Sequence, residues 1–217
     1  MAGLIADPFR TARLLLHLRQ EGVTDACVLT AMETIDRAAF VDDPAIAPLA
    51  FEDAMLAIPC GQVILRPAAT GHLLQALALP EDGSATVLLV GFGSGYMAAL
   101  AASLSRHVFS VDRYARLVRE GEARLARLGV GNVTVRQADG RDGWPEQGLF
   151  DRIVLACAVA EMPDVLLSQV RQGGRLVAPV VRGNDRAIVS VTLGAGVLRT
   201  PFFQHVPAMT EGRAAVL

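Results

Sequence analysis

Apolar side chains recur every three or four residues in the first third of the chain, which is the spacing of helices with one buried face. Leu14, Leu15 and Leu18 form such a face, and Gly22 follows as a helix terminator. Helices are therefore predicted over residues 9–21, 26–35 and 67–79. Residues 37–51 contain two prolines and are predicted to form a loop.

From residue 87 onward, short apolar runs alternate with helical segments, a pattern typical of a parallel sheet covered on both faces. The apolar runs predict strands over residues 87–90, 107–111, 132–136, 150–156 and 174–180. Helices are predicted after the glycines at 91–95 and over residues 114–128 and 163–172. Two alternating stretches, 187–193 and 197–204, flank a Gly-Ala-Gly turn and predict a terminal hairpin.

The segment 54–67 (AMLAIPCGQVILRP) does not follow either pattern. It is apolar, carries two prolines and a glycine, and has no long alternation of apolar and polar positions. It is either a buried connector or a loop that closes over a ligand, and its pattern leaves both interpretations open.

The length of 217 residues fits one domain over residues 1–217, with N-terminal helices in 1–80 and a core of alternating strands and helices in 81–217. Hydrophobic residues make up 52% of the chain and aromatic residues 5%, so the core is expected to consist of Ala, Leu and Val. The net charge of −2 argues against nucleic acid as a partner. No apolar run approaches the ~20 residues of a membrane span, and the first residues lack a secretory pattern. A cytoplasmic protein is expected.

The three cysteines, Cys27, Cys60 and Cys157, are far apart in the sequence and do not have the spacing of metal ligands. The four histidines are equally scattered, so no metal site is expected. Free thiols in a cytoplasmic protein are the simplest interpretation.

A glycine turn follows the first apolar run and precedes a helix. Its residues are Gly91, Phe92, Gly93, Ser94 and Gly95. Glycines let a ligand approach the backbone, and the helix that follows offers free N–H groups to a polar ligand. Dinucleotide sites usually carry G-x-G-x-x-G, whereas this chain has Tyr96 in place of the last glycine. The G-x-G-x-G spacing favours S-adenosylmethionine.

Acidic residues follow the next two predicted strands. Asp112 lies 17 positions after Gly95, where a carboxylate can accept hydrogen bonds from both ribose hydroxyls. Asp139 and Gly140 either present a carboxylate to an adenine amino group or make a turn. Arg141 and Trp144, farther along the same connection, either cover the adenine edge or lie in a surface loop, and the surface loop is the favoured prediction.

Several blocks in order resemble the protein-L-isoaspartate O-methyltransferase family. They are VLTAMETIDRAAFV, GQVILRP, VGFGSGYMAALAASL, NVTVRQADGRDG, LFDRIVLACAV, QVRQGGRLVAPV and a late Val206-Pro207. The resemblance implies an α/β fold of the Rossmann-like class I methyltransferases, with a mostly parallel seven-stranded sheet flanked by helices and an N-terminal helical extension.

The resemblance also implies site residues and ligands. S-adenosylmethionine would be the cofactor, S-adenosylhomocysteine the product, and a protein or peptide carboxylate, nominally an L-isoaspartyl residue, the substrate. The cofactor residues would be Gly91, Phe92, Gly93, Ser94, Gly95, Asp112, Arg113, Asp139, Gly140, Ala156 and Cys157. Gln62, Val63, Ile64 and Leu65 would face the substrate. No catalytic side chain is expected, because methyl transfer to a carboxylate is a direct displacement.

Three positions, in two regions of the chain, depart from the family pattern. The family loop usually reads G-Q-T-I-S, whereas Val63 and Leu65 replace its two hydroxyl residues here. Leu89 stands where the family usually has an acid that helps to orient the cofactor's ammonium group. Two alternatives to isoaspartate methylation therefore stay open, namely methylation of a more apolar substrate and a non-catalytic cofactor-binding or scaffold role.

Overall fold

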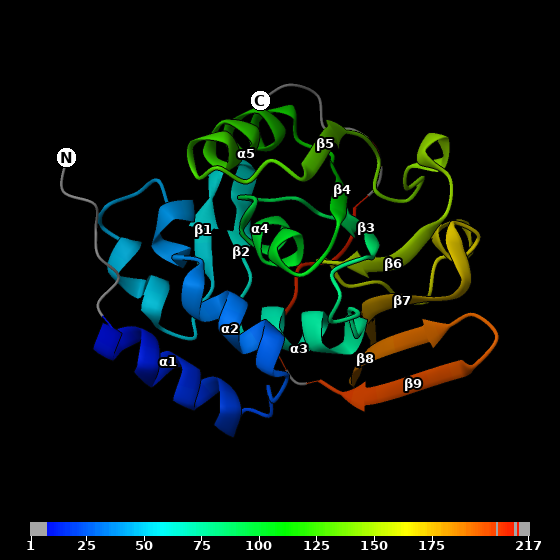
Figure 1. Ribbon diagram of the computed structural model, residues 1–217, viewed down its shortest axis with the longest axis horizontal. Coiled ribbons are helices and arrows are strands. Elements are labelled where there is room, and N and C mark those ends of the chain that lie inside the picture. The colour runs from blue at the N-terminus through cyan, green and yellow to red at the C-terminus, as the bar shows by residue number, and fades with distance from the viewer. Residues whose placement is uncertain (1–7, 203, 211, 213–217) are drawn as a thin grey trace.

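The computed structural model describes residues 8–202, 204–210 and 212 (Figure 1). The helices predicted at the N-terminus are present, and two short 3-10 helices, η1 and η2, follow them. The helical elements up to residue 77 are α1 (Pro8–Gln20), α2 (Ala26–Thr34), η1 (Arg37–Phe40), η2 (Ala47–Phe51), η3 (Pro59–Gly61) and α3 (Pro67–Leu77). Later in the chain lie α4 (Tyr96–Ser103), α5 (Ala115–Arg127), η4 (Pro145–Gln147) and α6 (Asp164–Leu167).

Seven strands form the main sheet in the order β5-β4-β3-β6-β7-β8-β9. They are β3 (Thr86–Val90), β4 (His107–Asp112), β5 (Val133–Gln137), β6 (Phe150–Leu155), β7 (Val170–Arg182), β8 (Asp185–Thr192) and β9 (Gly196–Pro201). Strands β3 to β7 run parallel, and β8 and β9 continue the sheet antiparallel. The predicted fold class and the terminal hairpin are confirmed.

The order in which successive strands are added to the sheet reverses at β3. From β3 the chain proceeds to β4 and β5 on one side, and it then returns to place β6 on the other side of β3. In sheets of this kind, ligands bind beyond the carboxyl ends of the strands at the point of reversal. The topology therefore directs attention to the ends of β3, β4 and β6.

The two faces of the sheet are covered unequally. Helices α1 to α5 all contribute to one apolar core, where Val87 and Leu89 of β3 are fully buried. Figure 1 shows α1 at the lower left, with α2 between it and α4, while β8 and β9 extend to the lower right. The opposite face, which includes Leu88 and Val90, is covered mainly by α6 and by the connection between β5 and β6.

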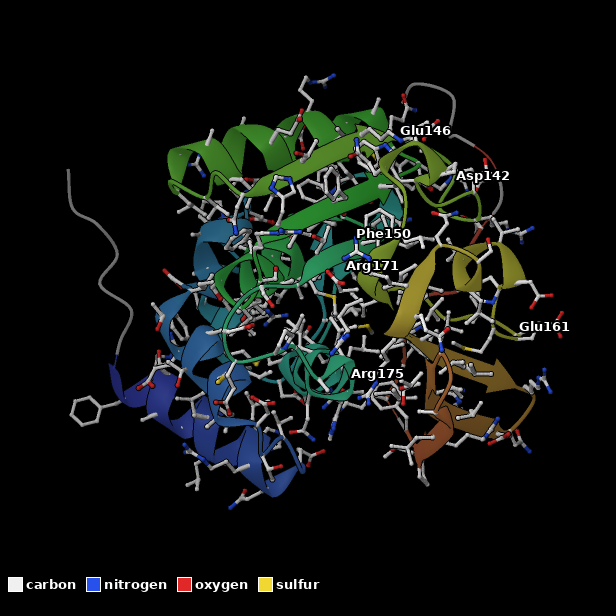
Figure 2. All side chains as sticks on the ribbon, turned by 45° about the vertical axis from the view of Figure 1, so that its right-hand side comes forward. Asp142, Glu146, Phe150, Glu161, Arg171 and Arg175 are labelled. Carbon is white, nitrogen blue, oxygen red and sulfur yellow. The ribbon has the colours of Figure 1, made fainter. Side chains whose placement is uncertain are left out.

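That connection differs from its prediction. Asp142 and Glu146 lie at the rim of the molecule (Figure 2), but Trp144 between them is only 6% exposed. The Trp144 ring packs edge-on against Phe109 at 5.4 Å, and the Arg136 guanidinium lies 4.3 Å above it. The prediction of a surface loop is therefore wrong for Trp144, which belongs to the core.

Three other predictions need correction. The helix predicted over 163–172 is only the single turn of α6, because the backbone at Gln169 already pairs with Phe150 of the sheet (N···O 2.8 Å). Strand β7 consequently begins four residues before the predicted 174 and continues to Arg182. The loop predicted over 37–51 contains η1 and η2, where local turns satisfy backbone groups despite the prolines.

The segment 54–67 forms a small antiparallel hairpin of β1 (Leu56–Ile58) and β2 (Gln62–Ile64), separate from the main sheet. Cys60 in its turn has a φ of +62°, a left-handed conformation that is uncommon for a residue other than glycine. Within the part of the chain that the structure describes, no helix is long and apolar enough to cross a membrane.

Candidate active site

The ends of β3, β4 and β6 are tied together by backbone hydrogen bonds. The Gly91 N–H donates to Val111 O at 2.9 Å, and the Ala156 N–H donates to Val90 O, also at 2.9 Å. The glycine turn after β3 therefore lies between the last residue of β4 and the first residues after β6. This is the position that the strand order predicts for a ligand.

The glycine turn needs its glycines. Gly91, Gly93 and Gly95 have φ values of +94°, +57° and +90°, which side-chain-bearing residues rarely adopt. Gly95 is also the residue that precedes α4, so the turn leads directly into the helix N-terminus. The turn is held from behind by the Phe92 ring, which packs against Gly121 of α5 so closely that a Cβ there would lie 2.2 Å from Phe92 Cε1.

Asp112 is the buried charge of the site. Its Oδ2 accepts a hydrogen bond from the Gly93 N–H at 2.8 Å and its Oδ1 accepts one from the Tyr114 N–H at 3.0 Å. Burial raises the pKa of Asp112, whereas these backbone donors counteract the shift by favouring the ionised form. A carboxylate has about four acceptor positions, so two remain for a ligand after these bonds.

A cleft runs along these strand ends as two hollows that share Gln62, Gly91, Asp112, Cys157 and Ala208. The larger hollow has about 630 Å³ including space open to solvent, and the smaller has about 440 Å³, which suits a small-molecule ligand. The larger is also lined by Val63, Ile64, Leu65, Thr70, Phe92, Gly93, Ser94, Tyr96, Met97, Ala156 and Pro207. The smaller is also lined by Val90, Val111, Arg113, Tyr114, Gly140, Met209 and Thr210.

The β1–β2 hairpin and the residue after it form one wall of the larger hollow, and a buried arginine fixes their position. Arg37 donates to Ala54 O at 2.7 Å before the hairpin and to Leu65 O at 3.0 Å after it. Burial lowers the pKa of Arg37 to about 10, so the side chain is still protonated at neutral pH. The segment 54–67 is therefore a buried structure as well as a wall of the cleft, which combines the two interpretations left open by its sequence.

Residues near the C-terminus form the opposite rim. The Ala158 N–H donates to Pro207 O at 2.7 Å, and the Met209 N–H donates to Ala158 O at 2.8 Å. The Arg113 guanidinium donates to the Thr210 hydroxyl and lies over the Tyr114 ring. The cleft is thus bounded on this side by a segment more than 90 residues away from Arg113 in the sequence.

The thiols of the cleft are unsuited to nucleophilic chemistry. Burial and, to a smaller extent, nearby Asp112 raise the pKa of Cys157 to about 12, so the thiol stays neutral at neutral pH. Burial also raises the pKa of Cys60. Across residues 8–202, 204–210 and 212, no three His, Cys, Asp or Glu side chains come together as a group that could hold a metal ion.

The structure brings together most of the residues predicted for the site. Those that line the cleft are Gln62, Val63, Ile64, Leu65, Gly91, Phe92, Gly93, Ser94, Asp112, Arg113, Gly140, Ala156 and Cys157. Gly95, the last residue of the glycine turn, packs against Phe92 and does not line the cleft, and Asp139 lines a separate surface hollow. The Asp139 carboxylate accepts hydrogen bonds from the N–H groups of Arg141 and Gly212, so it stabilises a turn and the C-terminal segment in this structure.

Leu89 lies outside the cleft. Side chains alternate along β3, and Leu89 points with Val87 into the helix-covered core, where it has no exposed surface. The apolar residue therefore suits its surroundings in this chain. Its contribution to the site is to hold β3 in place rather than to contact a ligand.

Sequence reasoning missed several residues that line the cleft. They are Thr70, Tyr96, Met97, Tyr114, Pro207, Ala208, Met209 and Thr210. Thr70 had a detectable signal, because it is a polar residue on the same helical stripe as Leu73, Leu74 and Leu77. The C-terminal residues had no such signal beyond the late Val206-Pro207.

Comparisons with known proteins agree with the fold. The sequence pattern of the family described as Protein-L-isoaspartate(D-aspartate) O-methyltransferase (PCMT) matches residues 10–198. A protein named protein-L-isoaspartate O-methyltransferase from Maricaulis maris (strain MCS10) is 44% identical over 185 residues, which cover 85% of each chain. One from Cereibacter sphaeroides (strain ATCC 17029 / ATH 2.4.9) is 49% identical over 172 residues, which cover 79% of this chain and 77% of the relative.

Solved structures support the same fold at lower identity. A structure named protein-L-isoaspartate O-methyltransferase has a TM-score of 0.79 at 22% identity and covers 94% of this chain and 66% of its own. A Plasmodium falciparum protein provisionally given the same name, in complex with S-adenosyl-L-homocysteine, has a TM-score of 0.76 at 20% identity, with 92% and 98% covered. The family match and the sequence relatives together establish that the chain belongs to the protein-L-isoaspartate(D-aspartate) O-methyltransferase family.

Proposed function

We propose that this protein binds S-adenosylmethionine in the cleft and transfers its methyl group to a carboxylate of a protein or peptide, nominally that of an L-isoaspartyl residue. Family membership supports the reaction, since relatives 43–49% identical carry the name of this enzyme. The single observation that carries the proposal is Asp112, a buried carboxylate with two acceptor positions left open beside a glycine turn.

The residues of the cleft fit the proposed cofactor. The glycine turn leaves its backbone accessible, and a Cβ on Gly91 would already touch the Cβ of Ala156 at 3.4 Å. Asp112 would hold the ribose hydroxyls with its remaining acceptor positions, and the turn would border the methionyl part. When bound, S-adenosylmethionine supplies an electrophilic methyl group on a positively charged sulfur. The chain's own task is to bind, orient and shield the reacting groups.

No proton acceptor is needed in this proposal. A carboxylic acid with a pKa near 3.9 is ionised at neutral pH, so it is nucleophilic without a general base. The neutral thiol of Cys157 accordingly has no covalent role. The contribution of the chain to the rate is alignment of the acceptor oxygen, together with exclusion of water by the apolar wall that includes Val63, Leu65 and Met97.

A different, more apolar carboxylate acceptor is the second candidate. The observation that favours it is the wall itself, because Val63, Ile64 and Leu65 offer hydrocarbon where a charged acceptor would gain from hydroxyl donors. A cytoplasmic place of action is proposed with either acceptor, because Cys27, Cys60 and Cys157 are free thiols.

Methyl transfer to a matched pair of peptides tests the proposal. An isoaspartyl peptide and its aspartyl twin are incubated with labelled S-adenosylmethionine and the protein, and base-labile methyl ester is measured as released methanol. Transfer to the isoaspartyl peptide alone is the expected result. Equal transfer to both peptides contradicts selectivity for the isoaspartyl linkage. Transfer to neither, by a protein that binds S-adenosylhomocysteine, contradicts the isoaspartyl assignment and favours the second candidate.

A further inference from the structure

Thr70 is a polar residue in an apolar stripe of α3. Its side chain is 1% exposed, and Leu73, Leu74 and Leu77 on the same stripe are buried equally deeply. Thr70 is also the residue by which α3 reaches the larger hollow of the cleft. A threonine is a poorer helix former than alanine or leucine, so neither burial nor helix formation accounts for its presence.

The Thr70 hydroxyl lacks the bond that helical hydroxyls usually make. Such groups commonly donate to the carbonyl four residues earlier, as Thr34 does to Thr30 O at 2.8 Å and Ser105 to Ala101 O at 2.7 Å. At Thr70 the backbone N–H donates to Arg66 O at 3.0 Å, but the hydroxyl has no hydrogen-bond partner among the described residues. A hydroxyl that lines the cleft and makes no bond to the described residues is available to a ligand that enters there.

The wall beside Thr70 has little other donor capacity. The side chains of Val63 and Leu65 carry only hydrocarbon and offer no hydrogen-bond donor. The Gln62 amide donates to Cys60 O at 3.2 Å. Two other hydroxyl side chains line the hollow, Ser94 within the glycine turn and Tyr96 at the start of α4. On the side of the hairpin and α3, Thr70 is the hydroxyl that faces the cleft.

We propose that the Thr70 hydroxyl donates a hydrogen bond to a carboxylate bound in the cleft, and so supplies the donor that Val63 and Leu65 do not. The inference rests on the proposed function, which brings two carboxylates into the cleft. One belongs to the acceptor peptide, and the other to the methionyl part of the cofactor. The same donor chemistry suits both, and binding measurements separate them.

Thr70→Val and Thr70→Ser are the matched variants. Valine replaces the hydroxyl by a methyl group of similar size, whereas serine keeps the hydroxyl and loses the methyl group. Dissociation constants are measured by calorimetry for S-adenosylhomocysteine and for the isoaspartyl peptide in the presence of saturating S-adenosylhomocysteine. Ser105→Ala, which removes a bonded buried hydroxyl at a residue that does not line the cleft, is the control for stability.

The expected result is that Thr70→Val raises the dissociation constant of one ligand about tenfold or more, while Thr70→Ser stays within about threefold of the wild type. An effect on the peptide identifies the acceptor carboxylate, and an effect on S-adenosylhomocysteine identifies the methionyl carboxylate. The melting temperature of Thr70→Val without ligand should stay close to that of the wild type, because the hydroxyl makes no bond to the described residues that the substitution could remove. Ser105→Ala should melt lower and bind both ligands normally.

Unchanged affinities for both ligands in Thr70→Val overturn the inference, and a lower melting temperature with unchanged affinities assigns Thr70 a structural role. The peptide methylation assay separates this failure from failure of the proposed function. If the wild type methylates the isoaspartyl peptide and Thr70→Val binds both ligands with unchanged affinity, only the role of Thr70 is overturned. If the wild type methylates neither peptide but Thr70→Val still weakens S-adenosylhomocysteine binding, only the isoaspartyl assignment is overturned. A wild type that binds neither ligand overturns both.

Discussion

The cleft has two ends that are built by different means. The cofactor end consists of the glycine turn and Asp112, and the acceptor end consists of the β1–β2 hairpin and Leu65. At the glycine turn and Asp112, backbone groups make the site, and the Asp112 carboxylate is itself held by two backbone N–H groups. At the β1–β2 hairpin, the backbone is fixed from behind by Arg37, and the surface offered to a ligand consists of side chains such as Val63 and Leu65. A site made of backbone tolerates substitution nearby, as at Leu89, whereas a site made of side chains changes its chemistry with each substitution.

Removal of the Asp112 carboxylate should have the largest effect, and it should fall on the cofactor end. In Asp112→Ala, two charge-assisted hydrogen bonds to a ligand are lost, which we expect to weaken S-adenosylhomocysteine binding by about 3 kcal/mol or more, a hundredfold or more. The N–H groups of Gly93 and Tyr114 also lose their acceptor, so the melting temperature should fall. Asp82→Asn, in an exposed turn, is the matched control for calorimetry. If the dissociation constant of S-adenosylhomocysteine for Asp112→Ala stays within threefold of the wild-type value, Asp112 does not hold the cofactor.

Restoring hydroxyls at the hairpin should affect only the acceptor end. The double variant Val63→Thr with Leu65→Ser adds two donors to the wall, and we expect kcat/KM for the isoaspartyl peptide to rise by about 10- to 100-fold. The dissociation constant of S-adenosylhomocysteine should stay within about threefold. Ala195→Ser, which adds a hydroxyl to the exposed turn between β8 and β9, away from the cleft, is the control. Unchanged kinetics in the double variant would show that the hydrocarbon wall does not limit this acceptor.

A methyl group added at Gly121, which packs against Phe92 of the glycine turn, should weaken cofactor binding although Gly121 does not line the cleft. Alanine usually stabilises a helix relative to glycine, yet a Cβ at Gly121 of α5 would overlap the Phe92 ring. We expect Gly121→Ala to lower the free energy of unfolding by about 1–3 kcal/mol and to weaken S-adenosylhomocysteine binding about tenfold. Gly131→Ala, which enters open space, should change neither quantity. A Gly121→Ala protein as stable as the wild type would mean that Phe92 repacks freely.

The pH dependence of cofactor binding should be the smallest effect, at a few-fold. Ribose hydroxyls donate to ionised Asp112, so affinity should fall as the pH drops through its raised pKa, beginning above the range of an ordinary aspartate near 3.9. The stability linkage has the opposite sign. Because burial raises the folded-state pKa, the contribution of Asp112 to folding decreases as pH rises from the unfolded pKa through the folded one. Titrations from pH 7 to pH 4.5 should show the fall for the wild type and a flat profile for Asp112→Asn.

Much of the fold was predictable because local sequence patterns identify most of its strands and helices. The buried strand before the glycine turn is a continuous apolar run, and the outer face of α5 is charged, so both elements are readily recognised. The end of α6 was not predictable, since Gln169 and Val170 satisfy helical spacing locally and are drawn into the sheet by pairing with Phe150. The local pattern allows either a helix or a strand at these residues, and pairing with a distant strand determines that they form a strand.

The site divides in the same way. Gly91 to Gly95 and Asp112 could be found because a strand, a turn and an acid follow one another at characteristic spacing. Trp144 and residues 207–210 have no periodicity that indicates their neighbours, and their positions depend on contacts with distant parts of the chain such as Phe109 and Ala158. Thr70 was visible as a polar residue in an apolar stripe, but only the cleft shows what it faces.

Titration of S-adenosylhomocysteine into the wild-type protein tests the central claim most directly, namely that the cofactor end is intact although the acceptor end has changed. Calorimetry should show one site per chain with a dissociation constant in roughly the micromolar range, and a ligand excess of 100 dissociation constants should stabilise the fold by about 2.7 kcal/mol. No detectable heat and no rise in melting temperature at about 1 mM ligand, a binding energy weaker than roughly 4 kcal/mol, would contradict the claim.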